Sequence, residues 1–237
     1  MGKKDRIPIL YEDGQLIVCE KPAGIPVQSD KTRDLDVIML LKNRIFEREG
    51  ALEEPYLTAV HRLDRPVGGL MVLARSKTAA SSLSEQVQTG LFEKYYQAVC
   101  CGRLEEDFGS MEDYLIRDGR KNVTSVVKKG TKGARYASLD YEMIDCIETK
   151  KGPLTWVLVI LRTGRHHQIR VQFASRGLPL YGDTRYNPAF RDAKKTYYQI
   201  GLYATRLAFV HPETGEKMVF KTEPKGTAFE LMDVEAF

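Results

Sequence analysis

The sequence predicts an α+β fold with a mixed, mainly antiparallel central sheet and flanking helices. Two observations support this class. Short apolar or alternating segments, which are typical of strands, recur along the whole chain and outnumber the segments with helical spacing. In addition, the sequence KKGP at 150–153 separates two strand-like segments, which indicates a hairpin turn between antiparallel strands.

The predicted strands follow from β-branched, aromatic and aliphatic runs bounded by turn residues. In chain order we expect them at 15–20, 56–60, 69–75, 93–101, 134–144, 154–162, 198–210 and 217–221. The loop at 21–28 contains two prolines and a glycine, so it should interrupt the sheet.

Three segments place apolar residues at helical spacing, and each one ends at a glycine. The first covers 34–49 and precedes Gly50, the second covers 77–90 and should stop at Gly90, and the third covers 166–177 and closes at Gly177. The helices are few and lie between strands, which agrees with the α+β class.

The length of 237 residues and the 43% apolar content suit one domain with a sizeable core, which we place over 1–237. The chain has no apolar run of about 18 residues, and its N-terminus MGKKDRIPIL is too polar for a secretory signal. We therefore expect a cytoplasmic protein without a membrane partner. The four cysteines have no CxxC spacing, so we expect free thiols.

Positive charge is concentrated in two segments. Residues 117–135 hold seven Lys or Arg and one Asp, and residues 162–176 hold four Arg and no acidic residue. The rest of the chain carries 25 basic and 31 acidic residues. Such segregation predicts a surface that faces a polyanion, although two solvated charged faces are the simpler alternative.

The segment AVHRLDRPVGGLMVLAR, 59–75, could carry chemistry. If VHRLD is extended, Arg62 and Asp64 face one side, and His61 faces the other. A neighbouring cation keeps a carboxylate ionised, so Asp64 is either a structural ion-pair partner or a nucleophile or base. From these residues alone, the structural ion pair is the better interpretation.

Two further segments could contribute to a site. In LRTGRHHQIR, Arg165 lies near a helix start, where a cation needs a compensating anion such as a buried carboxylate or an RNA phosphate. In EKYYQAV, Tyr95 and Tyr96 face opposite sides of a strand, so one can pack in the core while the other lines a pocket. Such a tyrosine can stack on an unpaired base.

No cofactor is expected, because the chain has neither GxGxxG nor GxxxxGK[ST]. No metal is expected either. The chain has four histidines and no carboxylate at ligand spacing, and adjacent His166 and His167 cannot both face one site on a helix.

Several segments together resemble the motifs of the RluA-type pseudouridine synthases, in order and spacing. They are DGQLIVCEKPAGIPV, HRLDRPVGGLMVLAR, EKYYQAVCCG, LRTGRHHQIRVQFASRGLPLYGDTRY and ATRLAFVHPETGEKMVF. The resemblance spans roughly residues 10–222. The HRLD block and the TGRxHQIR block about 100 residues later are highly specific when they occur together.

The resemblance implies an isomerase that converts uridine in ribosomal or transfer RNA to pseudouridine, without metal or cofactor. By position, Asp64 corresponds to the family's catalytic aspartate, Arg165 to the arginine that pairs with it, and Tyr96 to the active-site tyrosine, with Tyr95 as its packed neighbour. Arg62 corresponds to the arginine that helps displace the target base. The base must be flipped out of the RNA to reach such a site.

The partner implied is therefore structured RNA, and no obligate protein partner is evident, so we expect a monomer. Besides Arg62, the residues expected to contact RNA come from the two basic segments: Arg120, Lys121, Lys128, Lys129, Lys132, Arg135, His167 and Arg170.

The chain departs from the family pattern at two places. Val67-Gly68 stands where the family often has Thr-Ser, which removes two hydroxyls near Asp64, while Gly69 is retained. The chain also begins about ten residues before the first motif, so we expect no N-terminal S4 RNA-binding domain.

Two alternatives stay open. One is a non-catalytic RNA-binding protein on the same fold, and the other is a different enzyme with an aspartate nucleophile, such as a phosphatase. A phosphatase usually needs a second carboxylate nearby for magnesium, and no DxD surrounds Asp64. The route of isomerisation also stays open: attack of Asp64 on C6 of the base, attack on C1′ of the sugar, or proton removal to give a glycal.

Overall fold

A computed structural model describes residues 7–29, 34–50, 53–192 and 199–234, and it has the predicted α+β class. The chain divides into two compact units, which we describe one at a time. Unit 1 comprises Met1–Glu93 and Ala204–Glu223, and unit 2 comprises Lys94–Tyr203 and Pro224–Phe237. The organisation as a single domain stays a prediction.

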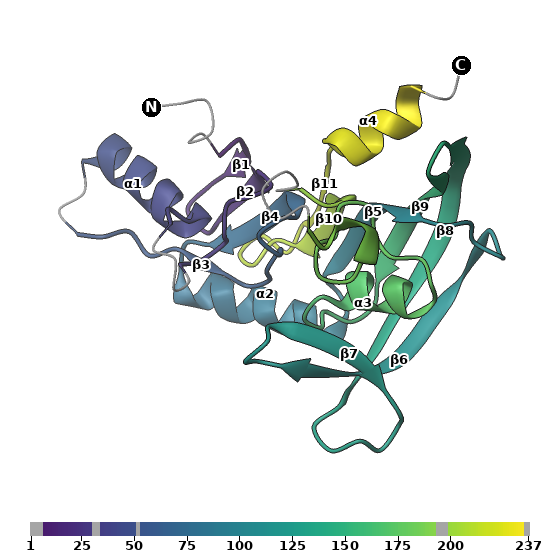
Figure 1. Ribbon diagram of the computed structural model, residues 1–237. Helices are drawn as coiled ribbons and strands as arrows, with labels where there is room; N and C mark the ends of the chain where they lie inside the picture. Colours follow the sequence, from purple (N-terminus) through teal and green to yellow (C-terminus); the bar gives the residue numbers. More distant parts are fainter. Residues whose placement is uncertain (1–6, 30–33, 51–52, 193–198, 235–237) are drawn as a thin grey trace. The chain divides into compact units, whose positions relative to one another are not determined.

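Unit 1 is a sheet with two helices (Figure 1). Its strands are β1 (Ile9–Glu12), β2 (Leu16–Lys21), β3 (Thr58–Ala59), β4 (Gly68–Ala74), β10 (Leu202–Val210, from Ala204 on) and β11 (Lys217–Lys221). The order is β1-β2-β4-β10, with β3 on β4 and β11 on β10. The pairings of β1 with β2, β2 with β4, β3 with β4 and β10 with β11 are antiparallel.

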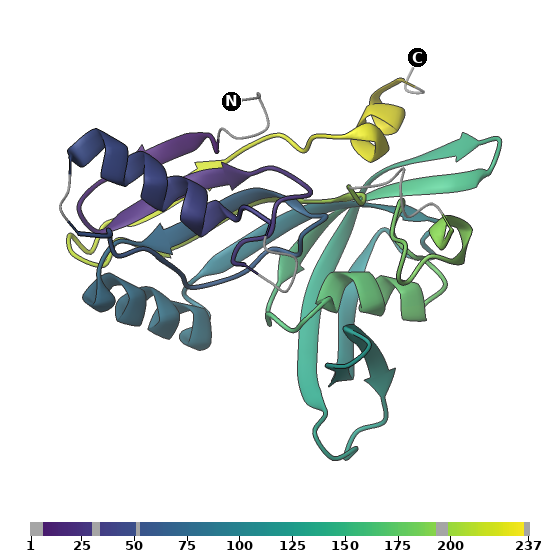
Figure 2. The same ribbon diagram turned by 60° about the vertical axis from the view of Figure 1, so that its left-hand side comes forward.

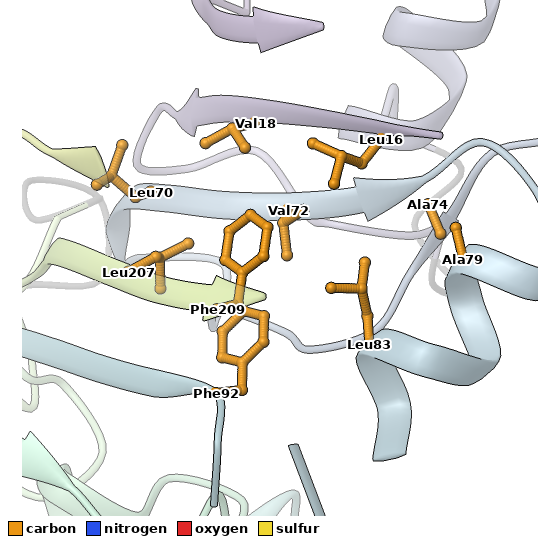
Figure 3. Close-up of a cluster of buried hydrophobic side chains, with 10 residues drawn as sticks. All are labelled: Leu16, Val18, Leu70, Val72, Ala74, Ala79, Leu83, Phe92, Leu207 and Phe209. Atoms are coloured by element: carbon orange, nitrogen blue, oxygen red, sulfur yellow. The ribbon is translucent and has the colours of Figure 1, made fainter. Parts of the chain in front are cut away.

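The central strands β2 and β4 are buried along their whole length, as expected for strands covered on both faces. Helix α2 (Lys77–Thr89) packs on one face, and α1 (Val37–Glu49) lies on the other side of this sheet (Figure 2). The core on the α2 side joins alternate residues of three strands to the helix (Figure 3). Its members are Leu16, Val18, Leu70, Val72, Ala74, Ala79, Leu83, Phe92, Leu207 and Phe209.

Both helices begin and end where local chemistry requires. The side chain of Asp36 accepts a hydrogen bond from the backbone N of Met39, and that of Ser76 accepts one from Ala79, so each helix has a polar N-cap. Gly50 and Gly90 adopt the left-handed conformation just beyond the two helices. The predicted stops of these helices are therefore confirmed.

Unit 2 is built on the sheet β5-β9-β8-β6-β7. Its strands are β5 (Glu93–Cys101), β6 (Phe108–Asp118), β7 (Val123–Val127), β8 (Arg135–Thr149) and β9 (Gly152–Leu161). Helix α3 (Gln168–Ser175) packs against β6 and β7 (Figure 2). A short 3-10 helix η2 (Pro188–Phe190) follows, and α4 (Thr227–Val234) packs Phe229 against Trp156 and Tyr203.

The predicted strands at 93–101 and 217–221 and the predicted hairpin at 150–153 are confirmed. The predicted strand at 56–60 shrinks to two residues, and β1, β6, β7 and α4 were not predicted. The first three missed elements are half-exposed or carry many polar residues, so they lack a strong apolar signal. All four cysteines are free, as predicted.

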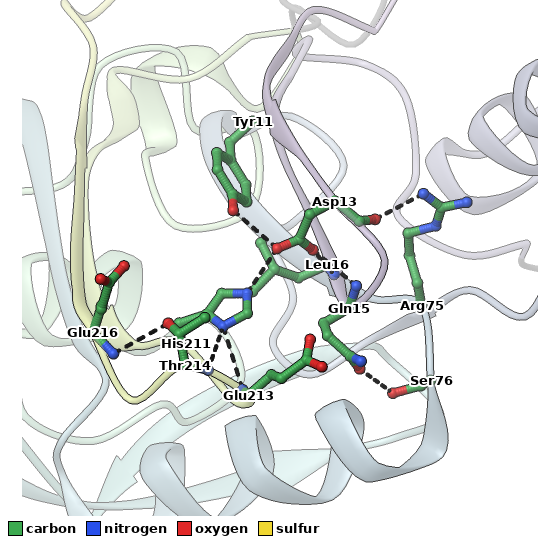
Figure 4. Close-up of polar contacts among 10 residues, drawn as sticks. All are labelled: Tyr11, Asp13, Gln15, Leu16, Arg75, Ser76, His211, Glu213, Thr214 and Glu216. Carbon is green, nitrogen blue, oxygen red and sulfur yellow. Dashed lines mark hydrogen bonds and ion pairs between the residues drawn. The ribbon is translucent and has the colours of Figure 1, made fainter.

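A polar network in unit 1 joins the β1–β2 turn to the β10–β11 turn (Figure 4). The carboxylate of Asp13 accepts hydrogen bonds from Tyr11 Oη at 2.9 Å and His211 Nε2 at 2.8 Å. His211 Nδ1 accepts from the backbone N of Glu213 and Thr214, so the proton is on Nε2. Burial raises the pKa of Asp13, but hydrogen bonds outweigh burial and hold that pKa below its usual value. The contact between Asp13 and His211 therefore has a structural role, since it joins the two turns.

Gly69 lies where the backbone of β10 leaves no room for a side chain. Its φ of +120° is a conformation that L side chains rarely adopt, and it pairs with Lys21 in the β2–β4 ladder. A Cβ atom at this position would lie 2.3 Å from the carbonyl oxygen of Ala204 on β10. The retained glycine of the motif is therefore required by packing and by backbone conformation.

We predict that Gly69→Ala destabilises the protein strongly. The added Cβ must displace backbone atoms of β10, and the backbone strain alone costs on the order of 1–3 kcal/mol. Urea unfolding measures the change in free energy. Gly14→Ala is the matched control, because a Cβ there meets nothing within 4 Å. Equal stability of the two variants would contradict the packing assignment.

Candidate active site

The segment that carries Asp64 lies in unit 1, between β3 and β4. It is not paired as a strand, but its side chains alternate as expected: His61 and Leu63 are buried, Arg62 is exposed and Asp64 is half-buried. His61 Nε2 accepts a hydrogen bond from the backbone N of Val72, which fixes this end of the segment to β4. Arg62 and Asp64 therefore face away from the core of unit 1.

The side chain of Lys21 holds the segment from the other side. Lys21 ends β2 and is fully buried. Its Nζ atom donates hydrogen bonds to the carbonyl oxygens of Pro22 at 2.9 Å, Ile25 at 2.7 Å and Arg65 at 3.2 Å. Three carbonyl acceptors match the three N–H groups of an ammonium ion. One buried cation thus joins the loop at 22–28 to the residue that follows Asp64.

Arg65 reinforces the same junction. Its carbonyl oxygen accepts a hydrogen bond from the backbone N of Gly24 at 2.7 Å, and its Nε donates to the carbonyl oxygen of Gly24 at 2.9 Å. The guanidinium also pairs with Asp34 at 2.6 Å. Since Val67 N donates to the carbonyl oxygen of Asp64, the backbone on this side of Asp64 is held as a turn.

Lys21 also sets the charge around Asp64. Burial lowers the pKa of Lys21 to about 7, and the carboxylate of Asp64 acts in the opposite direction. The interaction is mutual, so a protonated Lys21 favours the ionised carboxylate of Asp64. Lys21 was not among the site residues predicted from the sequence. The available signal was a lysine at the end of a mostly apolar strand, directly before Pro22.

The departure at Val67-Gly68 changes what surrounds Asp64. Val67 is buried and Gly68 begins β4. Since neither residue has a hydroxyl group, these two positions give Asp64 no hydroxyl neighbour. The turn itself is kept by the backbone hydrogen bond of Val67 and by Gly69. The shape of the turn thus survives without the two hydroxyls.

In unit 2, the turn that carries Arg165 is fixed by the side chain of Gln168. Gln168 Oε1 accepts hydrogen bonds from the hydroxyl of Thr163 at 2.7 Å and from the backbone N of Arg165 at 3.0 Å. Gln168 Nε2 donates to the carbonyl oxygen of Ser138 on β8. Arg165 Nε donates to the carbonyl oxygen of Tyr136 at 2.9 Å. These contacts explain why Thr, Arg and Gln occur at this spacing.

The two tyrosines of β5 occupy opposite faces, but their burial differs from the expectation. Tyr96 is buried, with 6% of its surface exposed, and Tyr95 is half-buried. The description of Tyr95 as the packed neighbour was therefore wrong in this respect, because Tyr96 is the more enclosed of the two. Tyr96 pairs with Val159 of β9 in the β5–β9 ladder.

The structure corrects the roles of two residues that we expected to contact RNA. Arg170 is 3% exposed and forms a two-point ion pair with Asp183, with N–O distances of 2.7 and 2.8 Å. His167 is also buried, and its Nδ1 contacts the hydroxyl of Tyr186 at 2.8 Å. Arg170 lies over the same Tyr186 ring. Basic composition could not distinguish these inward-facing residues from phosphate ligands.

His166 and His167 stack on each other, with ring centroids 3.7 Å apart. His166 contacts Thr124 Oγ1 through Nδ1 at 2.7 Å and Asn122 through Nε2 at 3.2 Å. Arg185 donates to the carbonyl oxygen of Lys121. The β6–β7 turn is thus attached to the segment that precedes α3.

The remaining basic residues of 117–135 are exposed, but they fall in two places. Arg120 and Lys121 lie in the β6–β7 turn, while Lys128, Lys129 and Lys132 lie in the loop between β7 and β8. Arg135, the first residue of β8, is also exposed. The continuous basic segment therefore folds into two basic patches at the two ends of β7.

Asp64 and Arg62 belong to unit 1, and Tyr96 and Arg165 belong to unit 2. The pairing of Asp64 with Arg165 stays a prediction. Among the described residues, no three His, Cys, Asp or Glu side chains form a group that could hold a metal ion. None of the described helices has the length and apolar character needed to cross a membrane.

We predict that Lys21→Met destabilises unit 1, although it replaces a buried charge with an apolar side chain. The carbonyl oxygens of Pro22, Ile25 and Arg65 lose their donor, and each unsatisfied buried acceptor costs about 1–3 kcal/mol. Urea unfolding measures the loss. An unchanged free energy of unfolding would show that these carbonyl groups find other donors.

Comparison with known proteins gives the family. The family model described as RNA pseudouridylate synthase matches residues 15–175, which include both the HRLD and the TGRHHQIR segments. Ribosomal large subunit pseudouridine synthase C of Buchnera aphidicola is 31% identical over 220 residues, which cover 90% of this chain and 66% of the relative. The tRNA pseudouridine synthase C of Vibrio parahaemolyticus is 30% identical over 230 residues, covering 91% of this chain and 89% of the relative.

Among solved structures, human RNA pseudouridylate synthase domain containing 4 superposes with a TM-score of 0.77 at 22% sequence identity, covering 96% of this chain and 92% of that one. This likeness supports the fold. The match over 15–175 includes Asp64, Tyr96 and Arg165 and the segments that carry them. The chain therefore belongs to the RNA pseudouridine synthase family whose motifs its sequence resembles.

Proposed function

We propose that this chain isomerises uridine in ribosomal or transfer RNA to pseudouridine, with Asp64 as the catalytic nucleophile or base. The observation that carries the proposal is the family match over 15–175, in which the HRLD segment is held by the buried cation of Lys21. The two relatives named for ribosomal and transfer RNA support these classes of substrate.

The chemistry requires an ionised carboxylate at Asp64. The bond between C1′ and N1 breaks, the base turns, a bond between C1′ and C5 forms, C5 loses its proton and N1 takes one up, so no atom is gained or lost. Asp64 serves either by attack on C6 or C1′ or by removal of a sugar proton, and an adjacent cation favours each role because it keeps the carboxylate charged. Lys21, whose Nζ donates to three carbonyl oxygens beside the segment, supplies such a cation when it is protonated, and the carboxylate of Asp64 in turn favours that protonated form.

The other site residues have distinct proposed roles. Arg62 is exposed and follows buried His61, which suits a side chain that enters the RNA and displaces the target base. Tyr96 offers a ring for stacking and a hydroxyl for proton transfer. Arg165 is held by its backbone and its Nε, which leaves its terminal nitrogens to pair with the Asp64 carboxylate.

RNA binding is proposed for the exposed basic residues of unit 2 together with Arg62. The two patches are the β6–β7 turn with Arg120 and Lys121, and the following loop with Lys128, Lys129 and Lys132, continued by Arg135. Their phosphate contacts would offset the cost of flipping a base, which is a few kcal/mol. Arg170 and His167 support this surface from within.

We further propose that units 1 and 2 form one catalytic domain over 1–237, since the family match runs through both. The substrate classes favour work in the cytoplasm, and the proposed reaction needs no cofactor, metal or second protein. A monomer in complex with structured RNA is therefore the proposed working form.

We predict that Asp64→Asn abolishes isomerisation but changes RNA affinity by less than about tenfold, because it removes the charge and keeps the size. Release of tritium from RNA that contains 5-tritiated uridine measures turnover. If the wild-type protein binds the RNA without releasing tritium, the non-catalytic binding protein becomes the better assignment. Full activity of Asp64→Asn would contradict the role of the carboxylate.

We predict that Lys128→Gln/Lys129→Gln weakens RNA binding and reduces the magnitude of the slope of log affinity against log salt by about 1–2. Each phosphate that the protein no longer contacts keeps about one counterion, which is then not released on binding. The matched control is Lys150→Gln/Lys151→Gln in the β8–β9 turn, which removes the same charge from another exposed turn. Equal slopes for both double variants would show that the β7–β8 loop faces away from RNA.

A further inference from the structure

Lys94 is a buried lysine with no protein partner in the part of the chain that the structure describes. It lies on β5 and is 6% exposed. No hydrogen bond or ion pair joins its ammonium group to a described residue. Every other buried Lys, Arg, Asp or Glu in the described part has such a partner: Glu20, Lys21, Asp36, Arg170 and Asp183.

The position of Lys94 relates it to the site residues of unit 2. Lys94 and Tyr96 are two residues apart on β5, so they share one face of the strand. Lys94 Nζ lies against the turn before α3, 3.5 Å from the point where a Cβ on Gly164 would be. Arg165 is the next residue of that turn. Lys94 therefore shares a strand face with Tyr96 and lies against the turn that carries Arg165.

Such an arrangement costs stability. Burial alone lowers the pKa of Lys94, and no group in the described part of the chain acts against it. Partial burial of a charged group without a partner is unfavourable. Groups that destabilise the folded protein in this way are typical of binding and catalytic sites, where a ligand supplies what is lacking.

We propose that Lys94 binds an anionic oxygen of the substrate nucleotide, beside Tyr96 and Arg165. The inference rests on the proposed function and adds a residue to that site. Two sources in the nucleotide have the required chemistry. One is a non-bridging phosphate oxygen, and the other is the O2 or O4 atom of uracil, which takes up negative charge when the C1′–N1 electron pair leaves with the base.

The key variant is Lys94→Met, which keeps an unbranched side chain only one atom shorter and removes its charge. Because no protein acceptor is lost, we expect Lys94→Met to have a melting temperature equal to or above that of the wild type. Lys21→Met is the matched control, since the same exchange there leaves three carbonyl groups without a donor. Opposite effects of the same substitution would show that Lys94, unlike Lys21, has no structural acceptor to lose.

Two measurements decide whether Lys94 binds the phosphate oxygen or the uracil oxygen. They are RNA affinity and the single-turnover rate of tritium release, both with ribosomal and transfer RNA transcripts that contain 5-tritiated uridine. If Lys94 binds phosphate, the dissociation constant rises at least about fivefold and the salt slope falls by about one. If it binds the uracil oxygen, affinity is kept and the single-turnover rate falls at least about tenfold.

The proposal is overturned if Lys94→Met melts below the wild type, since a protein partner would then exist. It is also overturned if affinity and rate both stay within about twofold of the wild type. Tritium release by the wild-type protein and by Asp64→Asn is measured in parallel. These two measurements test the isomerase assignment itself, so its failure can be told apart from a failure of the role of Lys94. Without wild-type tritium release the isomerase assignment fails, while melting and binding still decide the role of Lys94.

Discussion

The burial of one ammonium group, that of Lys21, is the constraint on which the arrangement around Asp64 depends. Acceptors stabilise an ammonium group that is removed from solvent, and all three acceptors of Lys21 are backbone carbonyl oxygens from two loops. The loop at 22–28 and the HRLD segment must therefore approach each other in one geometry. The strands β2 and β4 bring the two loops to the same end of the sheet, where Lys21 pairs with Gly69.

The corresponding turn of unit 2 is fixed by neutral groups. Gln168 uses both ends of its amide to join Thr163, the backbone of Arg165 and Ser138. The guanidinium of Arg165 is thus attached to a rigid backbone and needs no protein carboxylate within unit 2 to set its orientation. Behind this turn, the ion pair of Arg170 and Asp183 and the stacked histidines form a polar interior that supports α3.

Sequence patterns predicted the strongly apolar elements well. The strands at 93–101 and 217–221 and the helix α2 agree because their periodicity and end signals are local properties. The missed strand β6 mixes polar and apolar residues without regular alternation, and many of its side chains are exposed, so it gives little hydrophobic contrast. The HRLD motif led to Asp64 through family resemblance, since its residues alone favoured a structural ion pair.

Burial of polar residues was the property that sequence could not provide. Arg170 and Arg165 stand in the same basic segment, yet the first faces Asp183, thirteen residues further on, and the second is exposed. In the sequence, Lys21 and Lys94 cannot be distinguished from exposed lysines, yet both are buried in the structure. In each case the deciding partner is distant in sequence, or absent, and local pattern carries no information about it.

The composition of unit 1 also has a consequence for how the chain is made. Its core needs Leu207 and Phe209 of β10, and its polar network joins Asp13 to His211, which is 198 residues away. During translation, the core of unit 1 cannot be completed from residues 1–93 until all of 94–203 and then β10 have been synthesised. The long separation also makes closure of this core a slow, non-local step. The nascent N-terminal part is therefore the segment that most needs chaperone protection during translation.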